Sequence, residues 1–311
     1  MTIFLITIGV IAIFIIIFMI SGYIFYRIAI IRNTKSFLKQ KDTTRLSDWT
    51  TSSHEWLSNQ VIDEWSLKSR DGLMLKAYKL SQIEEKKRFA VIVHGYTGQY
   101  QDMAELAHLF YDSYGFNVVM PNLRGHGSSE GHYIGMGYPD RLDILAWIEE
   151  LVSLYGSDIE IVLLGVSMGG ATVSFLSGEE LPPQVKFIIS DCAFNSIKGI
   201  LAYQMKQMYP IPRFPLLYFA SRVTKLLAGY SFEDKKISNF VKRSTVPMVF
   251  IHGGNDKFVP TKMVHSLYDA CQTDKHLLIV NDATHGMAYR TDPVAYSDLI
   301  ETAINKYITV I

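Results

Sequence analysis

The sequence contains little cysteine and has no excess of either charge. Only two of its 311 residues are cysteines, Cys192 and Cys271, and their wide separation excludes a disulfide scaffold or a zinc finger. We expect both to be buried as small apolar side chains. Thirty basic and thirty acidic residues give a formal net charge of zero, so no overall field attracts nucleic acid. The sequence therefore predicts no nucleic-acid partner.

Metal-binding patterns and internal repeats are also lacking. Several histidines are scattered without the spacing of metal ligands: His54, His108, His132, His252, His265 and His276. We accordingly predict no metal and no cofactor. The composition, 49% hydrophobic, is sufficient for one large domain with a sizeable core. Nothing in the sequence indicates an oligomeric state.

A long hydrophobic run stands at the amino terminus. Residues 3–26 contain no charged side chain, and as a helix they reach about 36 Å, more than the roughly 30 Å of a bilayer core. The alternatives are a cleaved signal peptide and a buried core helix. The run has no basic region before it, is too long for a signal peptide and lacks a small-residue cleavage site. We therefore predict that residues 1–26 form an uncleaved, single-pass transmembrane helix in the cell membrane.

The next segment, residues 27–60, is polar, basic and rich in serine and threonine. We interpret it as a juxtamembrane linker that contains one surface helix. Its first part, residues 27–45, carries one acid, Asp42, and six basic residues: Arg27, Arg32, Lys35, Lys39, Lys41 and Arg45. By the positive-inside rule, this excess predicts that the bulk of the protein faces the cytoplasm.

The remaining chain, residues 61–311, alternates short β-rich runs with longer amphipathic stretches. The predicted strands are Val61–Lys68, Leu73–Leu80, Phe89–Val93, Asn117–Met120, Glu160–Leu164, Lys186–Ser190, Met248–Ile251 and His276–Val280. The predicted helices are Gln101–Tyr114, Pro139–Tyr155, Met168–Ser177, Thr261–Cys271 and Pro293–Tyr307. This rhythm is typical of an α/β domain, in which a mainly parallel sheet has helices on both faces.

One stretch, about residues 193–243, interrupts the rhythm. It is rich in methionine, proline and aromatic residues, namely Tyr203, Met205, Met208, Tyr209, Phe214, Tyr218 and Phe219. We interpret it as a helical insertion that caps the sheet and supplies an apolar pocket. The alternative is ordinary core packing of extra helices, because aromatic residues at helical spacing are often core.

Three residues suited to nucleophilic catalysis follow three predicted strands. Ser167 lies in the G-x-S-x-G pattern of residues 165–169, between a strand and a helix, where glycines permit a sharp turn that exposes the hydroxyl. Asp256 and His285 follow two later strands. Serine is a poor nucleophile unless an imidazole takes its proton, and the imidazole needs a carboxylate to orient it. The carboxyl ends of parallel strands bring such residues together.

At this point the chain resembles a known family over residues 61–311. The motifs are those above, together with His94-Gly95-Tyr96-Thr97-Gly98 and Asn122-Leu123-Arg124-Gly125-His126-Gly127-Ser128. They are similar to α/β-hydrolases of the serine aminopeptidase-like and cinnamoyl or feruloyl esterase-like type. The resemblance implies that Ser167 is the nucleophile, Asp256 the acid and His285 the general base. It also implies an oxyanion hole made by the backbone N–H groups of Tyr96 and Met168.

The residues leave some roles open. Asp191 follows another predicted strand and is an alternative acid, and Asp282 lies close to His285 in the sequence. We expect His94 and His126 to brace loops by hydrogen bonds to the backbone rather than to bind ligands.

The function that we predict is a membrane-anchored serine hydrolase, specifically a carboxylesterase for a small-molecule ester or acyl substrate. An aminopeptidase or amidase of the same fold is the alternative enzyme. A membrane-tethered binding module without activity is the third interpretation. The sequence does not indicate the natural substrate.

Overall fold

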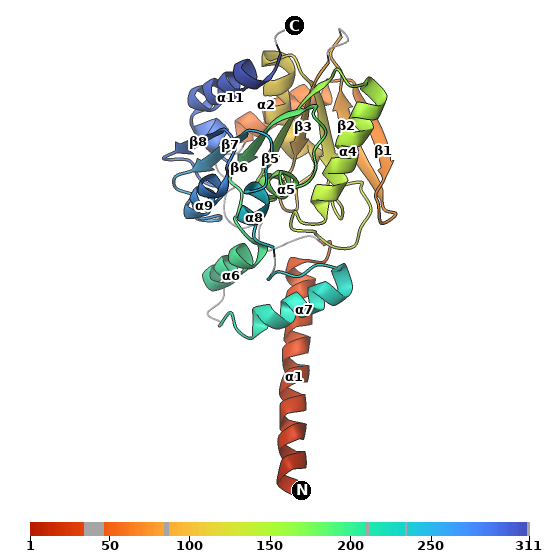
Figure 1. Ribbon diagram of the computed structural model, residues 1–311, viewed down its shortest axis with the longest axis vertical. Helices are drawn as coiled ribbons and strands as arrows, with labels where there is room; N and C mark the ends of the chain where they lie inside the picture. The colour runs from red at the N-terminus through yellow and green to blue at the C-terminus, as the bar shows by residue number, and fades with distance from the viewer. Residues whose placement is uncertain (34–46, 84–86, 209–211, 234, 310–311) are drawn as a thin grey trace.

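The structure is a computed structural model that describes residues 1–33, 47–83, 87–208, 212–233 and 235–309. Figure 1 shows a sheet domain with helices around it and one long helix, α1, extending away from the domain to the amino terminus. Two parts of the sequence predictions fall outside the described residues: residues 34–46 of the basic linker and Tyr209 of the proposed cap.

The sheet has eight strands in the order β1-β2-β4-β3-β5-β6-β7-β8 among the described residues. Strands β1 and β2 pair antiparallel, β2 also pairs antiparallel with β4, and all later neighbours are parallel. This confirms the mainly parallel sheet. The strands are β1 (Ile62–Lys68), β2 (Met74–Leu80), β3 (Arg88–Val93), β4 (Asn117–Asn122), β5 (Glu160–Val166), β6 (Val185–Asp191), β7 (Met248–Gly253) and β8 (Lys275–Val280).

Helices cover both faces of the sheet, as predicted. Along β3, Val91 and Val93 point into one buried cluster and Ala90 and Ile92 into the other, which is the two-residue period of a strand buried on both faces. The first face carries α4 (Asp140–Tyr155), α5 (Met168–Leu176) and α9 (Lys262–Ala270). The second carries α2 (Ser47–Ser58), α3 (Ala104–His108), α10 (Ala288–Thr291) and α11 (Pro293–Tyr307).

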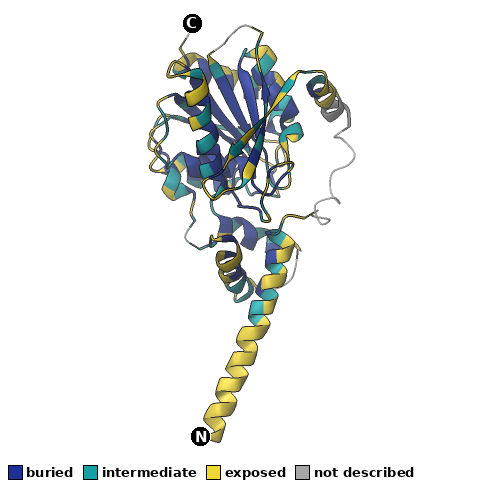
Figure 2. Ribbon diagram, turned by 90° about the vertical axis from the view of Figure 1, so that its right-hand side faces the viewer, coloured by how far each residue is buried: buried dark blue, intermediate teal, exposed yellow. Residues whose placement is uncertain are grey.

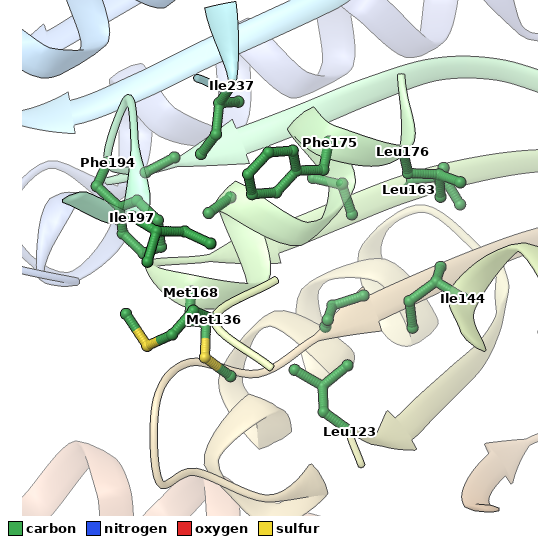
Figure 3. Close-up of a cluster of buried hydrophobic side chains, with 14 of the residues drawn as sticks. Leu123, Met136, Ile144, Leu163, Met168, Phe175, Leu176, Phe194, Ile197 and Ile237 are labelled. Carbon is green, nitrogen blue, oxygen red and sulfur yellow. The ribbon is translucent and has the colours of Figure 1, made fainter. Parts of the chain in front are cut away.

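The first buried cluster joins the sheet to the helix that follows β5. Figure 3 shows Met168, Phe175 and Leu176 of α5 together with Leu163 of β5 and Met136, which belongs to the loop before α4. All nine residues of α5 are buried. The helix is therefore held on every side, and its first turn cannot move independently of the sheet.

The single helix expected over residues 101–114 is three short pieces instead. A 3-10 turn, η2 (Tyr100–Met103), leads into α3, and a π-helical turn, η3 (Leu109–Ser113), follows. The start is tightened because the Asp102 carboxylate accepts the N–H of Gln99, and the Asn122 side chain accepts that of Tyr100. These tertiary contacts override the helical periodicity of the segment.

Helix α1 spans Thr2–Ala29, so the expected boundary at residue 26 lies inside it. It is the one helix in the described part of the chain that is long and apolar enough to cross a membrane. Figure 2 shows that its amino-terminal part is exposed and that burial begins near its other end. There Ile30 is fully buried and Ile31 forms a β-bridge with Tyr133. The start of the expected linker is thus packed against the sheet domain.

Arg32 and α2 extend this packing. The Arg32 guanidinium donates to the carbonyl oxygens of Ser129 at 2.7 Å and Gly127 at 2.5 Å. In α2, Leu57 is buried against the second face, and the Trp56 indole donates to Asp112 at 3.0 Å. The surface helix expected in residues 27–60 is therefore present and docked on the domain.

The insertion between β6 and β7 contains three helices, α6 (Ile197–Met208), α7 (Leu216–Ala228) and α8 (Ser238–Val241). Helices α6 and α7 lie beyond the carboxyl ends of the strands, where α7 crosses α1 (Figure 1), whereas α8 packs against α5 and α9. The crossing is close because α1 carries glycine there: a Cβ on Gly22 would lie 2.7 Å from the backbone carbon of Phe219. The insertion is helical, as predicted, but its longest helix packs on α1.

Candidate active site

Ser167 stands at a strained turn between β5 and α5. Its φ of 58° and ψ of −114° are uncommon for any residue with a side chain. The turn closes because the residues two positions before and after Ser167 are glycines, which have no side chains. A Cβ on Gly165 would lie 2.1 Å from the oxygen of Gly169, and a Cβ on Gly169 would lie 2.0 Å from that of Val93. The Ser167 N–H donates to the backbone carbonyl oxygen of Asp191 at 2.8 Å, which fixes the turn to β6.

The three predicted side chains lie in one hydrogen-bonded line. His285 Nε2 is 2.8 Å from Ser167 Oγ, and His285 Nδ1 is 2.7 Å from Asp256 Oδ2. Asp256 follows β7 and His285 follows β8, so adjacent parallel strands present the two residues at the same edge as Ser167. This geometry allows the imidazole to accept the serine proton while the carboxylate holds its other nitrogen protonated. Ser167 and His285 are partly exposed, whereas the Asp256 side chain is buried.

Asp256 is held ionised by its neighbours. Burial raises its pKa, but hydrogen bonds from His252 and His285 outweigh burial and leave the pKa well below the ordinary value. Its Oδ1 also accepts the N–H groups of Phe258 and Val259, each at 2.8 Å. A carboxylate that receives this many donors is stable as an anion and fixed in orientation.

His252 adds a contact at the back of this carboxylate. Its Nε2 lies 2.9 Å from the Val259 oxygen and 3.2 Å from Asp256 Oδ2. Since Val259 offers a carbonyl, Nε2 carries the hydrogen and His252 acts as a donor. His252 thus supports the turn that carries Asp256.

The alternative acids make other contacts. The hydroxyl of Tyr296 donates to Asp191 Oδ2 at 3.1 Å, and burial raises the pKa of Asp191 to about 6. Asp282 is exposed on the loop after β8. The hydrogen bond of His285 Nδ1 goes to Asp256, so the arrangement favours Asp256 over Asp191 and Asp282 as the acid.

Two backbone segments approach the serine from opposite sides. Met168 is the first residue of α5, so its N–H has no acceptor within the helix. The loop after β3 passes close to the turn, because a Cβ on Gly95 would lie 3.4 Å from Ser167 Cβ and 3.9 Å from Ser167 Oγ. Tyr96 follows in this loop. The N–H groups of Tyr96 and Met168 are therefore carried by the two segments nearest the serine, where an oxyanion requires fixed donors.

Two histidines brace the loop after β3, as expected. His94 Nε2 accepts the N–H of Leu123 at 3.0 Å, and its Nδ1 lies 2.8 Å from the Gly95 oxygen. His126 Nε2 accepts the N–H of Thr97 at 3.2 Å. Burial, with the charge of His126, lowers the pKa of His94 to about 3, so His94 is neutral and keeps its acceptor nitrogen.

The side chain of Tyr96 connects this loop to α1, which the sequence did not indicate. Its hydroxyl donates to the oxygen of Ala29, the last residue of α1, at 2.7 Å. Burial raises the pKa of Tyr96, so the hydroxyl remains a donor. The residue whose N–H is the expected oxyanion donor is thus tied to the end of the apolar helix.

Among the residues that the structure describes, no three His, Cys, Asp or Glu side chains come together as a metal site. The line of Ser167, His285 and Asp256 can instead support attack by an activated hydroxyl on a carbonyl carbon, with charge developing beside the loop after β3.

Comparisons with known proteins agree with this geometry. Residues 84–226 match the family described as serine aminopeptidase, S33. The uncharacterised protein YqkD of Bacillus subtilis is 26% identical over 235 residues, which is 76% of each chain.

Solved structures share the fold. The esterase Pf2001 of Pyrococcus furiosus superimposes with a TM-score of 0.66 at 18% identity, covering 82% of this chain and 96% of the esterase. Est1E of Butyrivibrio proteoclasticus, solved with ferulic acid, superimposes with a TM-score of 0.60 at 18% identity and covers 78% of this chain and 99% of that one. The sheet order and these likenesses show that the chain has the α/β-hydrolase fold.

Proposed function

We propose that this chain is a membrane-anchored serine hydrolase that cleaves carboxylic esters. The observation that carries the proposal is the continuous hydrogen-bonded line from Ser167 Oγ through His285 to Asp256. A serine hydroxyl becomes a nucleophile near neutral pH when an imidazole accepts its proton and a carboxylate orients that imidazole. The order of the three residues along this chain, serine then acid then histidine, is the order used by α/β-hydrolases.

The first half of the reaction forms an acyl-enzyme. His285 Nε2 takes the proton of Ser167 as Oγ bonds to the ester carbon, and the carbonyl oxygen becomes an oxyanion between the N–H groups of Tyr96 and Met168. The carbon–oxygen bond to the alcohol then breaks, and His285 returns the proton to the leaving alcohol.

The second half releases the acid. Water gives a proton to His285 Nε2 and attacks the acyl carbon, and the second oxyanion forms in the same position. Its collapse breaks the bond to Ser167 Oγ, which recovers the proton from His285. Asp256 remains ionised throughout and stabilises the imidazolium that forms twice in each cycle.

The aminopeptidase alternative is favoured by the name of the matching family, but the insertion offers it little. A free amino group would require an acidic side chain near the serine. Glu233, the acid of the insertion that the structure describes, accepts a hydrogen bond from Ser221 and lies 3.8 Å from the Lys198 amine. Because Glu233 is already engaged, an ester with an apolar acyl or aryl group fits this insertion better.

Membrane attachment is the second part of the proposal. Helix α1 has the length and composition to span a bilayer, and its amino-terminal part makes no contact with the domain. The excess of basic residues in 27–45 supports a cytoplasmic domain. An epitope at the carboxyl end should therefore be protected from external protease in intact cells, and its digestion there would overturn this orientation.

The catalytic proposal is tested by labelling detergent-solubilised protein with a fluorophosphonate probe. Wild type should be labelled, Ser167→Ala and His285→Ala should not, and Ser297→Ala on α11 is a matched control that should be labelled like wild type. Wild type that has not been treated with the probe should hydrolyse p-nitrophenyl esters faster than aminoacyl anilides. Faster anilide hydrolysis would favour the aminopeptidase. A folded wild-type protein that neither reacts with the probe nor hydrolyses either substrate would favour the binding module.

A further inference from the structure

The insertion helix α7 packs crosswise on α1 at the level where α1 leaves the domain (Figure 1). The rings of Phe219 and Phe18 stack with centroids 5.4 Å apart, and the backbones meet at Gly22. One face of α7 is buried in this packing and against the domain, including Leu217 and Ala220. The two helices therefore form a rigid cross, and the position of α1 in a membrane determines that of α7.

The exposed positions of α7 carry apolar and basic side chains next to one another. Phe214, just before the helix, is 76% exposed and Leu226 is 77% exposed, and Tyr218 and Leu227 are also exposed. We call these four residues the α7 surface. Three basic side chains are exposed in the same segment, Arg213, Arg222 and Lys225. Apolar residues beside cations are the composition of helices that lie in a membrane interface.

The length of α1 places this surface at the bilayer. Every residue from Thr2 to Ile17 is exposed, and the first contacts begin at Phe18. This free section is about 16 residues, or about 24 Å of helix. It is shorter than a hydrocarbon core of about 30 Å, so an inserted α1 must enter the bilayer as far as about Gly22. That is the level of the crossing with α7.

The catalytic groups lie just above this level. Ala29, about two turns beyond Gly22, accepts a hydrogen bond from the hydroxyl of Tyr96, and the residue before Tyr96, Gly95, lies close to Ser167. The insertion begins after the carboxyl end of β6, where the backbone carbonyl oxygen of Asp191 accepts the Ser167 N–H. The end of α1, the insertion and the candidate site are thus in direct contact.

We propose that α7 is a second membrane contact, which lies in the plane of the bilayer with the α7 surface among the lipid acyl chains. The substrates are then esters of apolar acyl chains that reside in the membrane and reach Ser167 from the bilayer side. This substrate class rests on the proposed hydrolase function, whereas the placement of α7 does not.

The placement is tested by site-directed fluorescence in full-length protein. Three variants, Leu226→Cys, Ile11→Cys and Leu154→Cys, are labelled with an environment-sensitive NBD dye and reconstituted into phosphatidylcholine–phosphatidylglycerol vesicles with or without brominated acyl chains. Leu154 is a matched control, an exposed leucine at 57% on α4. The native Cys192 and Cys271 are buried, and unsubstituted protein gives the background.

The labels at positions 11 and 226 should both be blue-shifted and quenched by bromine, while the label at 154 should remain in water. A label at 226 that behaves like the one at 154, with position 11 quenched, would overturn the proposal and leave the anchor intact. A label at 226 shielded from both water and bromine would mean that a protein covers α7, which also overturns it. An unquenched label at 11 would overturn the anchor and this inference together.

The substrate class is tested by comparing two esters. The double variant Leu226→Ser/Leu227→Ser should lower the ratio of the rate on a long-chain ester in vesicles to the rate on a soluble short-chain ester by about tenfold, equivalent to about 1.4 kcal/mol. Leu154→Ser should leave this ratio unchanged. An unaltered ratio in the double variant would overturn the membrane route for the substrate. Absence of turnover on both esters in wild type would count against the hydrolase function, while the dye measurement still decides the placement of α7.

Discussion

Two neighbouring regions of the molecule, the carboxyl edge of the sheet and the crossed helices α1 and α7, differ in how far their groups are satisfied within the protein. At the carboxyl edge of the sheet, the Asp256 carboxylate accepts four hydrogen bonds, from the side chains of His252 and His285 and from two backbone N–H groups. Just beyond this edge, α1 and α7 pack on each other but leave their remaining apolar surfaces exposed. The sheet edge is complete in itself, whereas the crossed helices are incomplete without an apolar surrounding.

The difference shows how a rigid site can be joined to a membrane element. The site depends on backbone turns that tolerate no displacement, such as the one at Ser167. The stability of the crossed helices depends on whether water or lipid surrounds their apolar surfaces. They meet the site through a few specific contacts, among them the β-bridge of Ile31 with Tyr133 and the hydrogen bond of Tyr96 to Ala29. Each prediction below changes either the sheet domain or the crossed helices.

The largest effect is expected at the sheet edge, from Asp256→Asn. Asparagine keeps the size of the side chain but no longer enforces the required tautomer of His285 or stabilises its cation, so kcat should fall by about 10⁴-fold. Steady-state hydrolysis of a soluble ester measures it. Asp191→Asn is the matched control, since Asp191 is another buried acid at a strand end, and should lose less than about tenfold. The reverse ranking would make Asp191 the acid.

A large effect is also expected where the helices cross, from Gly22→Leu. The new Cβ meets backbone rather than a movable side chain, so α1 and α7 must separate, at a cost of about 3 kcal/mol. We expect the Tm of the detergent-solubilised protein to fall by about 5–10 °C and α7 to become sensitive to protease. Gly9→Leu is the control, because a Cβ there meets nothing within 4 Å. Equal effects of the two substitutions would mean that the crossing is not a packed contact.

The sheet domain also contains a buried acid that should make its stability depend on pH. Asp140 begins α4, and its Oδ2 accepts the N–H of Gly137 at 2.9 Å, while Oδ1 finds no partner within the described residues. Burial raises its pKa to about 7. Because the folded state holds this proton more tightly than the unfolded state, its stabilising effect is full below about pH 4 and is lost as pH rises through about 7.

Asp140→Asn should therefore reduce the loss of stability between pH 5 and 8 by on the order of 2 kcal/mol. Thermal melts of wild type and variant across this range measure it. Asp298→Asn on α11, an exposed carboxylate, should melt with the pH profile of wild type. Parallel profiles for Asp140→Asn and wild type would show that Asp140 stays ionised in the folded protein.

The sheet and the crossed helices also differ in how far the sequence predicts them. The sheet was predictable because each strand is a short apolar run between turn residues: Phe89–Val93 was expected and β3 is Arg88–Val93. The serine, acid and histidine follow such strands, so a correct sheet already brings them near one another. Between Asp256 and Asp191 the pattern could not choose, because both follow parallel strands, and only the three-dimensional position of His285 separates them.

The crossed helices could not be predicted in the same way. The run of residues 3–26 is apolar on all sides, so it carries no periodicity to mark Gly22 or Phe18 as contact positions. Their partner Phe219 lies about two hundred residues later in the chain, and no local pattern connects the two. The hydrogen bond from Tyr96 to Ala29 could not be predicted either, because the acceptor is a backbone oxygen, which no residue type identifies.

The smallest effect tests that hydrogen bond, with Tyr96→Phe. The ring and the backbone N–H remain, but the oxygen of Ala29 loses its donor, which should cost about 1 kcal/mol and lower the Tm by about 2–4 °C. Because the same residue carries the proposed oxyanion donor, kcat should fall several-fold, by less than about tenfold, with little change in KM. Tyr203→Phe on α6 is the control, since its hydroxyl donates to the Lys257 oxygen at 3.0 Å away from this loop. If kcat is unchanged in Tyr96→Phe while stability falls in both variants, the contact only fastens α1. A selective fall in kcat would mean that the end of the membrane helix helps to hold the oxyanion loop in position.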